Sequence, residues 1–190
     1  MAVIYLINNI KTLEVKIKVK KIGYLCNKEI SIKSIMACLR RATIDDVFSM
    51  QQCNLYCLPE NYQIKYYYFH SVTWPQLLQV ATDSAETNKI TGYVLAKIED
   101  ESGINHGHIT SIAVLRSYRC LGIARKLLEQ THYEMKNTFN TPYCSLHVRV
   151  SNLAAKHLYQ NVLNYTSQCI ESKYYADNED AYFMKLYFKK

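Results

Sequence analysis

Hydrophobic and polar side chains alternate with two different periods along this chain. Apolar residues spaced three or four positions apart predict an amphipathic helix, and short apolar runs between turn-forming residues predict β-strands. The helical period is clearest over residues 121–139, where charged side chains occupy the opposite face. The positions expected to face a sheet are Ile123, Ala124, Leu127, Leu128, Thr131 and Met135. Arg125 and Lys126 then fall on the solvent side of this helix.

The same two periods predict the other elements of a single mixed α/β domain. The predicted strands are residues 39–42, 78–82, 89–99, 106–115, 143–150, 165–170 and 180–188. One helix is predicted from Thr43 to about Leu58, where Pro59 ends it. Shorter helical segments are predicted over residues 65–70, 74–78 and 151–162. Thr43 and Ser151 are the predicted N-caps, because their hydroxyl oxygens can accept a hydrogen bond from the first helical turn.

The overall composition is that of a folded protein. Hydrophobic residues make up 49% of the 190 positions and charged residues 21%, which argues against a disordered chain. The longest apolar runs are far shorter than the roughly 18 residues that a membrane-spanning helix needs, so no membrane partner is expected. Seven cysteines occur without the spacing of a disulfide framework. We therefore expect reduced thiols in a cytosolic or nuclear protein.

Positive charge is concentrated at the N-terminal end. Residues 1–35 contain seven lysines and two glutamates, so they carry +5 of the chain's net charge of +7. We therefore divide the chain into a basic extension, residues 1–37, and a nearly neutral globular domain, residues 38–190. The extension alternates apolar residues with lysine, which is compatible with an added strand pair or with a segment that binds RNA. A transit peptide is disfavoured because arginine is absent, and a further hypothesis is that Met36 is the true start.

One glycine-containing turn indicates an anion-binding site. The sequence Arg119-Cys120-Leu121-Gly122-Ile123-Ala124 joins a predicted strand to the long helix. The first backbone N–H groups of a helix have no partner within it, and with the helix dipole they attract an anion. Gly122 lets a phosphate approach the backbone, and Arg119 adds a positive charge. An ordinary helix start, with glycine easing a tight turn and the arginines in water, explains the same residues.

The spacing of the residues around Gly122 indicates which anionic ligands the turn can bind. Neither the P-loop spacing G-x-x-x-x-G-K-[ST] nor the dinucleotide spacing G-x-G-x-x-G occurs in the chain. The turn resembles the acetyl-CoA-binding segment of the GCN5-related N-acetyltransferase (GNAT) superfamily, in which Arg/Gln-x-x-Gly-x-Gly/Ala follows a strand and opens a helix. The resemblance extends to the family of catalytic subunits of N-terminal acetyltransferase A (NatA) complexes and covers about residues 38–190. It is carried by the segments "CNLYCLPENYQIKYYYFH", "WPQL", "GYVLAKIED", "HGHITSIAV", "LHVRVSNLAAKHLY" and "YYADNEDAYFMK".

The resemblance implies a fold and a co-substrate. The implied GNAT fold is a mixed, mostly antiparallel central sheet with helices on both faces. Acetyl-CoA is the implied co-substrate, with its pantetheine arm along the backbone of the strand and its pyrophosphate on the amides of the turn. The residues implied to bind it are Ile112, Ala113, Val114, Arg119, Cys120, Leu121, Gly122, Ile123, Ala124 and Asn152.

Four residues are candidates for catalysis. The α-amine has a pKa of about 8 and needs only mild base assistance, and the resemblance implies that Glu60, in its loop, acts in this step. Tyr159 follows Asn152 by two helical turns on the same face, and it is either the implied proton donor to the leaving thiolate or a core tyrosine. His147 and Arg149 share one face of a strand, which points either into the acceptor cleft or into the core.

The resemblance also implies an acceptor and a partner. Leu58, Pro59, Tyr62, Tyr174 and Tyr175 would line the entrance for substrate N-termini, because tyrosines combine an apolar wall with hydroxyl groups. The implied substrates begin with Ser, Ala, Thr, Gly, Val or Cys, or with acidic residues when the subunit acts alone. A large helical auxiliary subunit would cover residues 43–58 and 65–78. It would hold the enzyme at the ribosome in the cytoplasm, with the nucleus as a second location.

Two other functions are compatible with parts of the sequence. A lysine acetyltransferase, or an N-terminal acetyltransferase of another class, would share the cofactor turn, although "LPENY" and "KYYADNEDAY" favour the first interpretation. A ribosome- or RNA-binding module would use the basic extension, but no direct nucleic-acid binding by the nearly neutral domain is expected. The pairs His106 with His108 and Cys53 with Cys57 lack further partners at zinc spacing, so no metal site is predicted.

Overall fold

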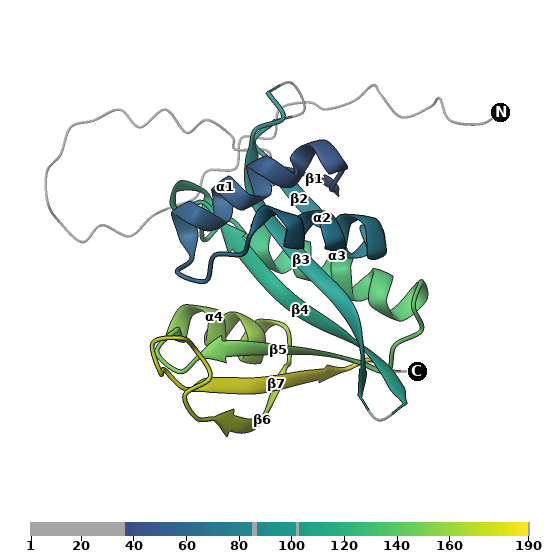
Figure 1. The fold of residues 1–190 in the computed structure, drawn as a ribbon, viewed down its shortest axis with the longest axis vertical. Helices are drawn as coiled ribbons and strands as arrows, with labels where there is room; N and C mark the ends of the chain where they lie inside the picture. Colours follow the sequence, from purple (N-terminus) through teal and green to yellow (C-terminus); the bar gives the residue numbers. More distant parts are fainter. Residues whose placement is uncertain (1–36, 85–86, 102, 190) are drawn as a thin grey trace, which may run out of the picture. The chain divides into compact units, whose positions relative to one another are not determined.

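The computed structural model describes residues 37–84, 87–101 and 103–189, so the predictions for residues 1–36 lie outside the described part of the chain. The described residues form a seven-stranded sheet with helices on both faces, as predicted (Figure 1). The strands are β1 (Cys38–Arg41), β2 (Gln79–Thr82), β3 (Ile90–Glu101), β4 (Ile104–Val114), β5 (Tyr143–Arg149), β6 (Thr166–Glu171) and β7 (Ala181–Tyr187). Their spatial order is β1-β2-β3-β4-β5-β7-β6, and every neighbouring pair is antiparallel except β4 and β5, which are parallel.

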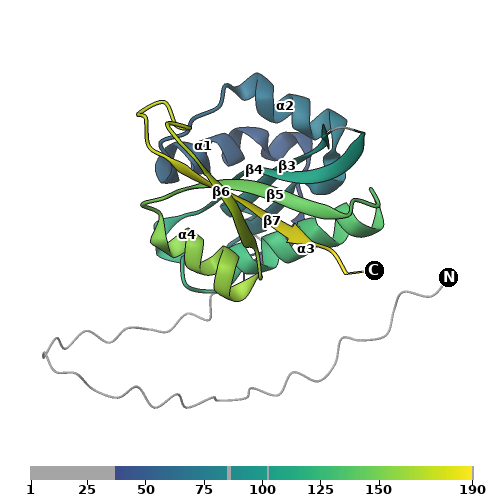
Figure 2. The same cartoon turned by 90° about the horizontal axis from the view of Figure 1, so that it is seen from below.

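The helices cover the two faces of the sheet in pairs (Figure 2). α1 (Val47–Cys57) and α2 (Ile64–Thr73) pack on one face, over an apolar cluster that includes Tyr93 of β3. α3 (Ile123–Asn137) and α4 (Leu153–His157) cover the other face, where α3 packs on β2, β3 and β4. Short 3₁₀ turns cover Ile44–Asp46, Pro75–Leu77 and Arg116–Tyr118.

The long helix α3 packs by the face that its sequence predicts. Its buried residues are Ile123, Leu127, Leu128, Thr131, His132 and Met135, while Ala124 is half-buried. Arg125 and Lys126 are exposed, and Arg125 pairs with Glu129 one turn further on. Full burial of one leucine side chain contributes about 1.5–3 kcal/mol, so Leu127 and Leu128 fix α3 firmly against the sheet.

The start of α4 differs from the sequence prediction. Ser151 is not its N-cap: Asn152 is, because the Asn152 Oδ1 accepts a hydrogen bond from the Ala155 N–H at 3.2 Å. Two adjacent residues could both cap this helix, and the polypeptide enters the helical conformation one residue later than predicted. Thr43 is the N-cap of the 3₁₀ turn Ile44–Asp46 that leads into α1, and the N-cap of α1 itself is Asp46. The Asp46 carboxylate accepts a hydrogen bond from the Thr43 N–H at 2.7 Å.

β4 and β5 separate after a short stretch of pairing (Figure 1). Only residues 107–109 of β4 pair with residues 144–146 of β5, although β4 continues to Val114. The register of β4 against β3 shifts at Thr110, and a bulge of this kind bends a strand. Within the described chain, no strand therefore pairs with the β5-facing edge of residues 110–114.

His132 makes the stability of the domain depend on pH. Burial lowers its pKa to about 4 in the folded protein, and its Nε2 lies 2.6 Å from the Tyr165 hydroxyl oxygen. The unfolded chain binds a proton at this residue below about pH 6.5, whereas the folded chain does not until about pH 4. From this residue alone we expect about 2 kcal/mol less unfolding free energy at pH 5.0 than at pH 7.5, measured by urea denaturation.

The matched variant is His132→Phe, which removes the titrating group and keeps an aromatic ring. The difference in unfolding free energy between the two pH values should shrink by about 2 kcal/mol in this variant. The buried His108, whose pKa is also lowered to about 4, is retained and keeps part of the pH dependence. If the difference in unfolding free energy between the two pH values is unchanged in the variant, His132 is not a source of the pH dependence.

Candidate active site

The separated ends of β4 and β5 open into a cavity of about 780 Å³. Pockets for small molecules and cofactors measure about 300–1,000 Å³, so this cavity can hold a substantial ligand. All predicted site residues except Leu121 line it. They are Leu58, Pro59, Glu60, Tyr62, Ile112, Ala113, Val114, Arg119, Cys120, Gly122, Ile123, Ala124, His147, Arg149, Asn152, Tyr159, Tyr174 and Tyr175.

The turn before α3 has the backbone geometry of an anion site. Gly122 is the N-cap of α3 in the left-handed conformation, with φ of 78°, and Cys120 also has a positive φ of 61°. The first helical hydrogen bond runs from the Lys126 N–H to the Gly122 carbonyl at 3.1 Å, so the amides of residues 123–125 have no carbonyl partner within the helix. A Cβ on Gly122 would meet no atom of the described residues within 4 Å. Glycine therefore suits both the local conformation and the approach of a ligand.

Arg119 is fixed beside this turn by the strand that precedes it. Its Nε donates to the Val114 carbonyl oxygen at 3.0 Å, and its terminal nitrogens make no hydrogen bond with the described residues. Those nitrogens can therefore donate to an anionic ligand.

The Leu121 side chain is half exposed and does not line the cavity, so the prediction for Leu121 is limited to its backbone amide.

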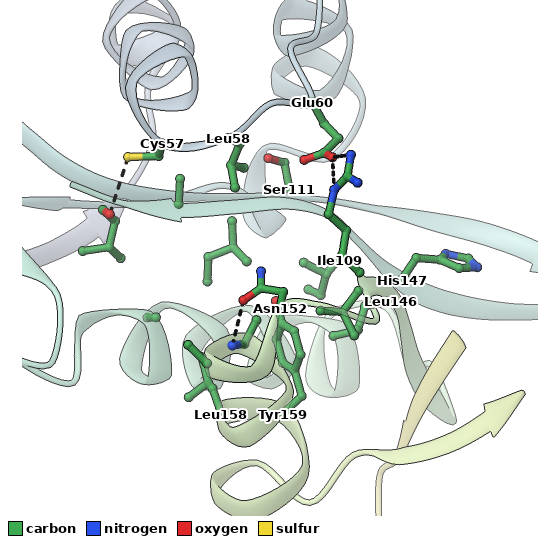
Figure 3. Close-up of a pocket in the computed structure, with 18 of the residues that line it drawn as sticks. Cys57, Leu58, Glu60, Ile109, Ser111, Leu146, His147, Asn152, Leu158 and Tyr159 are labelled. Carbon is green, nitrogen blue, oxygen red and sulfur yellow. Dashed lines mark hydrogen bonds and ion pairs between the residues drawn. The ribbon is translucent and has the colours of Figure 1, made fainter. Parts of the chain in front are cut away.

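Asn152 and Tyr159 lie on the opposite side of the cavity from Glu60 (Figure 3). Asn152 uses its Oδ1 to cap α4, which leaves its Nδ2 to donate to a ligand carbonyl. Tyr159 lies in a π-helical turn, Leu158–Val162, that continues α4, and such turns are frequent at functional sites. Burial raises the pKa of Tyr159, so its hydroxyl remains protonated and can donate a proton.

The Glu60 carboxylate is held by one residue of β5. Arg149 Nε donates to Glu60 Oε1 at 2.7 Å, and Arg149 Nη2 lies 2.5 Å from the same oxygen (Figure 3). The Asn54 side chain donates to the Glu60 backbone carbonyl at 3.1 Å and thereby fixes the loop. Glu60 Oε2 makes no hydrogen bond with the residues that the structure describes. One carboxylate oxygen is therefore fixed, and the other can accept a proton.

Arg149 also contacts two carboxylates that sequence analysis missed. Its Nη1 lies 3.0 and 2.8 Å from the two carboxylate oxygens of Asp177 and 2.7 Å from Glu179 Oε2. The guanidinium carbon lies 4.0 Å from the centre of the Tyr175 ring, a cation–π contact. The segment "YYADNEDAY" displays both acidic residues beside the predicted substrate tyrosines, but no spacing in the sequence relates them to a residue of β5.

The predicted acceptor entrance is lined by aromatic side chains. Tyr62 stacks on Tyr66 with ring centres 4.8 Å apart, and Tyr174 meets Tyr175 edge to face at 5.1 Å. Burial raises the pKa of Tyr62 to about 12 and also raises the pKa values of Tyr174 and Tyr175, so these hydroxyls are neutral. Neutral rings with hydroxyl groups suit the backbone and small side chains of an extended peptide.

His147 lines the cavity but lies between two aromatic rings. Its ring stacks on Tyr174 at 4.2 Å and on Phe183 at 4.9 Å between ring centres. Glu171 Oε2 lies 3.2 Å from His147 Nε2 at an angle unsuited to a hydrogen bond, and neither ring nitrogen is hydrogen-bonded to a described residue. Stacking fixes the ring, and the catalytic role of His147 stays a prediction.

His108 is a cavity residue that sequence analysis considered only as a metal ligand. Its Nδ1 lies 2.9 Å from Ser145 Oγ of the neighbouring strand, and burial lowers its pKa to about 4, so the ring is neutral.

Across the described ranges, no group of three His, Cys, Asp or Glu side chains is placed to hold a metal ion. None of the helices in these ranges combines the length and apolar character needed to cross a membrane.

An opened sheet beside a glycine turn at a helix start, with a carboxylate and a phenol across one cavity, is the arrangement that the resemblance to acetyltransferases implied. The chain belongs to the Acetyltransferase (GNAT) family, whose sequence model matches residues 45–165. The predicted fold and family are therefore confirmed.

Curated relatives specify the branch of the family that the chain resembles. The NatA complex catalytic subunit NAA10 of Arabidopsis thaliana is 56% identical over 150 residues, which cover 79% of this chain and 77% of that protein. The NatA complex catalytic subunit ard1 of Schizosaccharomyces pombe is 55% identical over 148 residues, which cover 77% of this chain and 82% of that protein.

Solved structures of N-terminal acetyltransferases share the fold. A chain of the NatC complex bound to Gag peptide and CoA has a TM-score of 0.75 and 26% identity, over 80% of this chain and 99% of that chain. Chaetomium thermophilum Naa20 in complex with a bisubstrate analogue has a TM-score of 0.70 and 28% identity, over 80% of this chain and 86% of that chain.

Proposed function

We propose that this protein transfers the acetyl group of acetyl-CoA to the α-amino group of protein N-termini, as the catalytic subunit of a NatA-like complex. The observation that carries the proposal is the placement of Glu60 and Tyr159 on opposite sides of one cavity (Figure 3). The anion-binding turn and the tyrosine wall line the same cavity. The high identity to NatA catalytic subunits supports the choice of acceptor.

The residues of the opened sheet and of α3 fit acetyl-CoA, which supplies an activated acetyl thioester. Arg119 and the amides of residues 120–124 would bind its pyrophosphate, since both attract anions. The edge of residues 112–114, which pairs with no described strand on the β5 side, would hydrogen-bond the pantetheine arm as a further strand would. Asn152 Nδ2 would donate to a carbonyl of the same arm.

The chemistry proposed for the chain's own residues is a proton removal and a proton donation. At pH 7 about a tenth of a free α-amine is already neutral, so a single carboxylate suffices as base. Glu60 Oε2 takes the amine proton, directly or through one water, while the amine nitrogen bonds to the acetyl carbon. The bond from that carbon to sulfur breaks, and the Tyr159 hydroxyl donates a proton to the leaving sulfur.

We also propose that α1 and α2 dock on a large auxiliary subunit. Large apolar side chains are exposed on both helices and on the turn before them, an arrangement typical of interaction surfaces. They are Ile44, Phe48, Leu55, Tyr56, Phe69 and Val72. The relatives named above are subunits of a complex, which supports a protein partner of this kind. Through it the enzyme would act at the ribosome in the cytoplasm, and also in the nucleus.

This docking surface makes a testable prediction. The double variant Phe48→Ser, Val72→Ser should bind the auxiliary subunit at least about tenfold more weakly, because central apolar anchors dominate interface energies. Acetylation by the isolated subunit should be unchanged, since neither side chain lines the cavity. Ile170→Ser, at an apolar residue of β6 that is 54% exposed, is the control. Equal binding by the double variant and the control in a pull-down would contradict the proposed docking surface.

The proposed acceptor is tested with peptides that begin Ser, Ala, Asp, Glu or Met-Leu. The full chain is incubated with acetyl-CoA and each peptide, with and without the auxiliary subunit, and acetylated product is measured. Turnover on the Ser and Ala peptides is expected in the complex, and turnover on the Asp and Glu peptides by the subunit alone. No turnover on any of the five would contradict the proposed function.

A further inference from the structure

Arg149 carries one positive charge, and three negatively charged carboxylates surround it. One guanidinium group contacts the carboxylates of Glu60, Asp177 and Glu179, each with an oxygen within 3.0 Å of a nitrogen. The contacts are divided: Nε and Nη2 hold Glu60, and Nη1 holds the other two. Hydrogen bonds from Ser151 and from Arg149 lower the pKa of Glu179 to about 2, and those from the Glu179 N–H and from Arg149 lower the pKa of Asp177. Both are therefore ionised at neutral pH.

The division of these contacts decides how Arg149 faces Glu60. Asp177 and Glu179 act on the same guanidinium and offset part of its charge. By holding Nη1 they also fix the direction in which the rest of the guanidinium faces Glu60.

We infer that Asp177 and Glu179 are positioning residues for the catalytic base: they hold Arg149 through Nη1, so that its Nε and Nη2 keep the Glu60 carboxylate aligned. The inference rests on the proposed role of Glu60. It assigns a function to the segment between β6 and β7 beyond that of its two tyrosines, because this segment carries both carboxylates.

The other titratable groups around Glu60 do not replace these two carboxylates. Tyr62 from the substrate loop and Tyr175 from the segment after β6 are neutral, since burial raises both pKa values. Two further groups that line the cavity come from β3 and β4. Lys97 is paired with a carboxylate of its own strand at 2.5 Å, and burial keeps His108 neutral.

Glu179 has a second contact that Asp177 lacks. Its Oε1 accepts a hydrogen bond from the Ser151 N–H at 2.9 Å, immediately before α4, which Asn152 caps. Glu179 thereby links the base to the helix that precedes the proposed acid, Tyr159, while Asp177 is 61% exposed. Loss of Glu179 should therefore affect turnover more than loss of Asp177.

The test compares Asp177→Asn, Glu179→Gln and the double variant with the wild-type chain. Each single variant should lower kcat by about two- to fivefold, and the double variant by about 20-fold, because in the single variants one carboxylate still holds Nη1. The loss in the double variant should fall on kcat, because Arg149 would no longer hold Glu60 Oε1 in line with the amine. The KM for acetyl-CoA should stay within about twofold of wild type, because neither residue lines the cavity.

Two controls separate positioning from structural support. The exchange Asp177→Glu with Glu179→Asp keeps both charges and should retain most of the wild-type kcat. In the Glu60→Gln background the double variant should cause little further loss of kcat, because the group that it positions is already absent. Wild-type kcat in the double variant, or the same loss of about 20-fold in the Glu60→Gln background, would overturn the inference. Failure of the wild-type chain to acetylate α-amines would instead contradict the proposed function, and kcat would then be measured with the amine that is accepted.

Discussion

Glu60→Gln is expected to lower kcat by about 10²–10³-fold while leaving the affinity for acetyl-CoA unchanged. General-base catalysis contributes about 10²–10⁴-fold, and glutamine keeps the shape of the side chain but cannot accept the proton at neutral pH. Glu60 lies across the cavity from Asn152 and is remote in sequence from the anion turn, so cofactor binding should not depend on it (Figure 3). Steady-state kinetics of the complex with a Ser-initiated peptide measure kcat, and isothermal titration measures acetyl-CoA binding.

Glu129→Gln is the matched control for this variant. Glu129 lies on the exposed face of α3 and does not line the cavity, so the same chemical change there should leave kcat near the wild-type value. A Glu60→Gln enzyme with the wild-type kcat would show that Glu60 is not the base. One that lost affinity for acetyl-CoA would assign Glu60 to cofactor binding instead.

Gly122→Val is expected to weaken acetyl-CoA binding by at least about tenfold, which corresponds to about 1.4 kcal/mol. Gly122 has a φ of 78°, and the added Cβ would point into open space where the proposed pyrophosphate binds. The kcat at saturating acetyl-CoA should change much less, because the reacting groups lie elsewhere in the cavity. Titration calorimetry measures the affinity for acetyl-CoA, and steady-state kinetics measure the KM for acetyl-CoA and the kcat.

Gly103→Val provides a control with the same backbone strain. Gly103 has a φ of 82° and does not line the cavity, and an added Cβ there would meet no atom of the described part of the chain within 4 Å. Both variants should lose a similar amount of stability, but only Gly122→Val should lose affinity for acetyl-CoA. Equal effects of both variants on acetyl-CoA binding would contradict an anion site at the start of α3.

The anion turn could be predicted from the sequence because its determinants are local. A strand, a basic residue, a glycine and an amphipathic helix follow one another within about 30 residues, and each has its own period or residue preference. The structure adds the left-handed conformation of Gly122, which explains the glycine by its φ as well as by its small size. The same locality made the buried face of α3 predictable.

The surroundings of Glu60 could not be predicted in the same way. Glu60 and Arg149 are 89 positions apart, and no period relates them. Their meeting depends on the parallel pairing of β4 with β5 and on the bulge at Thr110, and neither leaves a signal in the apolar pattern. Asp177 and Glu179 look like ordinary polar loop residues in the sequence, because their partner on β5 becomes visible only in the fold.

The most direct test of the proposed function locates the acetyl group on a peptide that offers both kinds of amine. The full chain, together with the auxiliary subunit and acetyl-CoA, is given a peptide that begins with serine and carries one internal lysine, and the product is sequenced by tandem mass spectrometry. The structure and the relatives lead us to expect acetyl on the α-amine and none on the lysine side chain. Acetylation of the lysine alone would contradict the account.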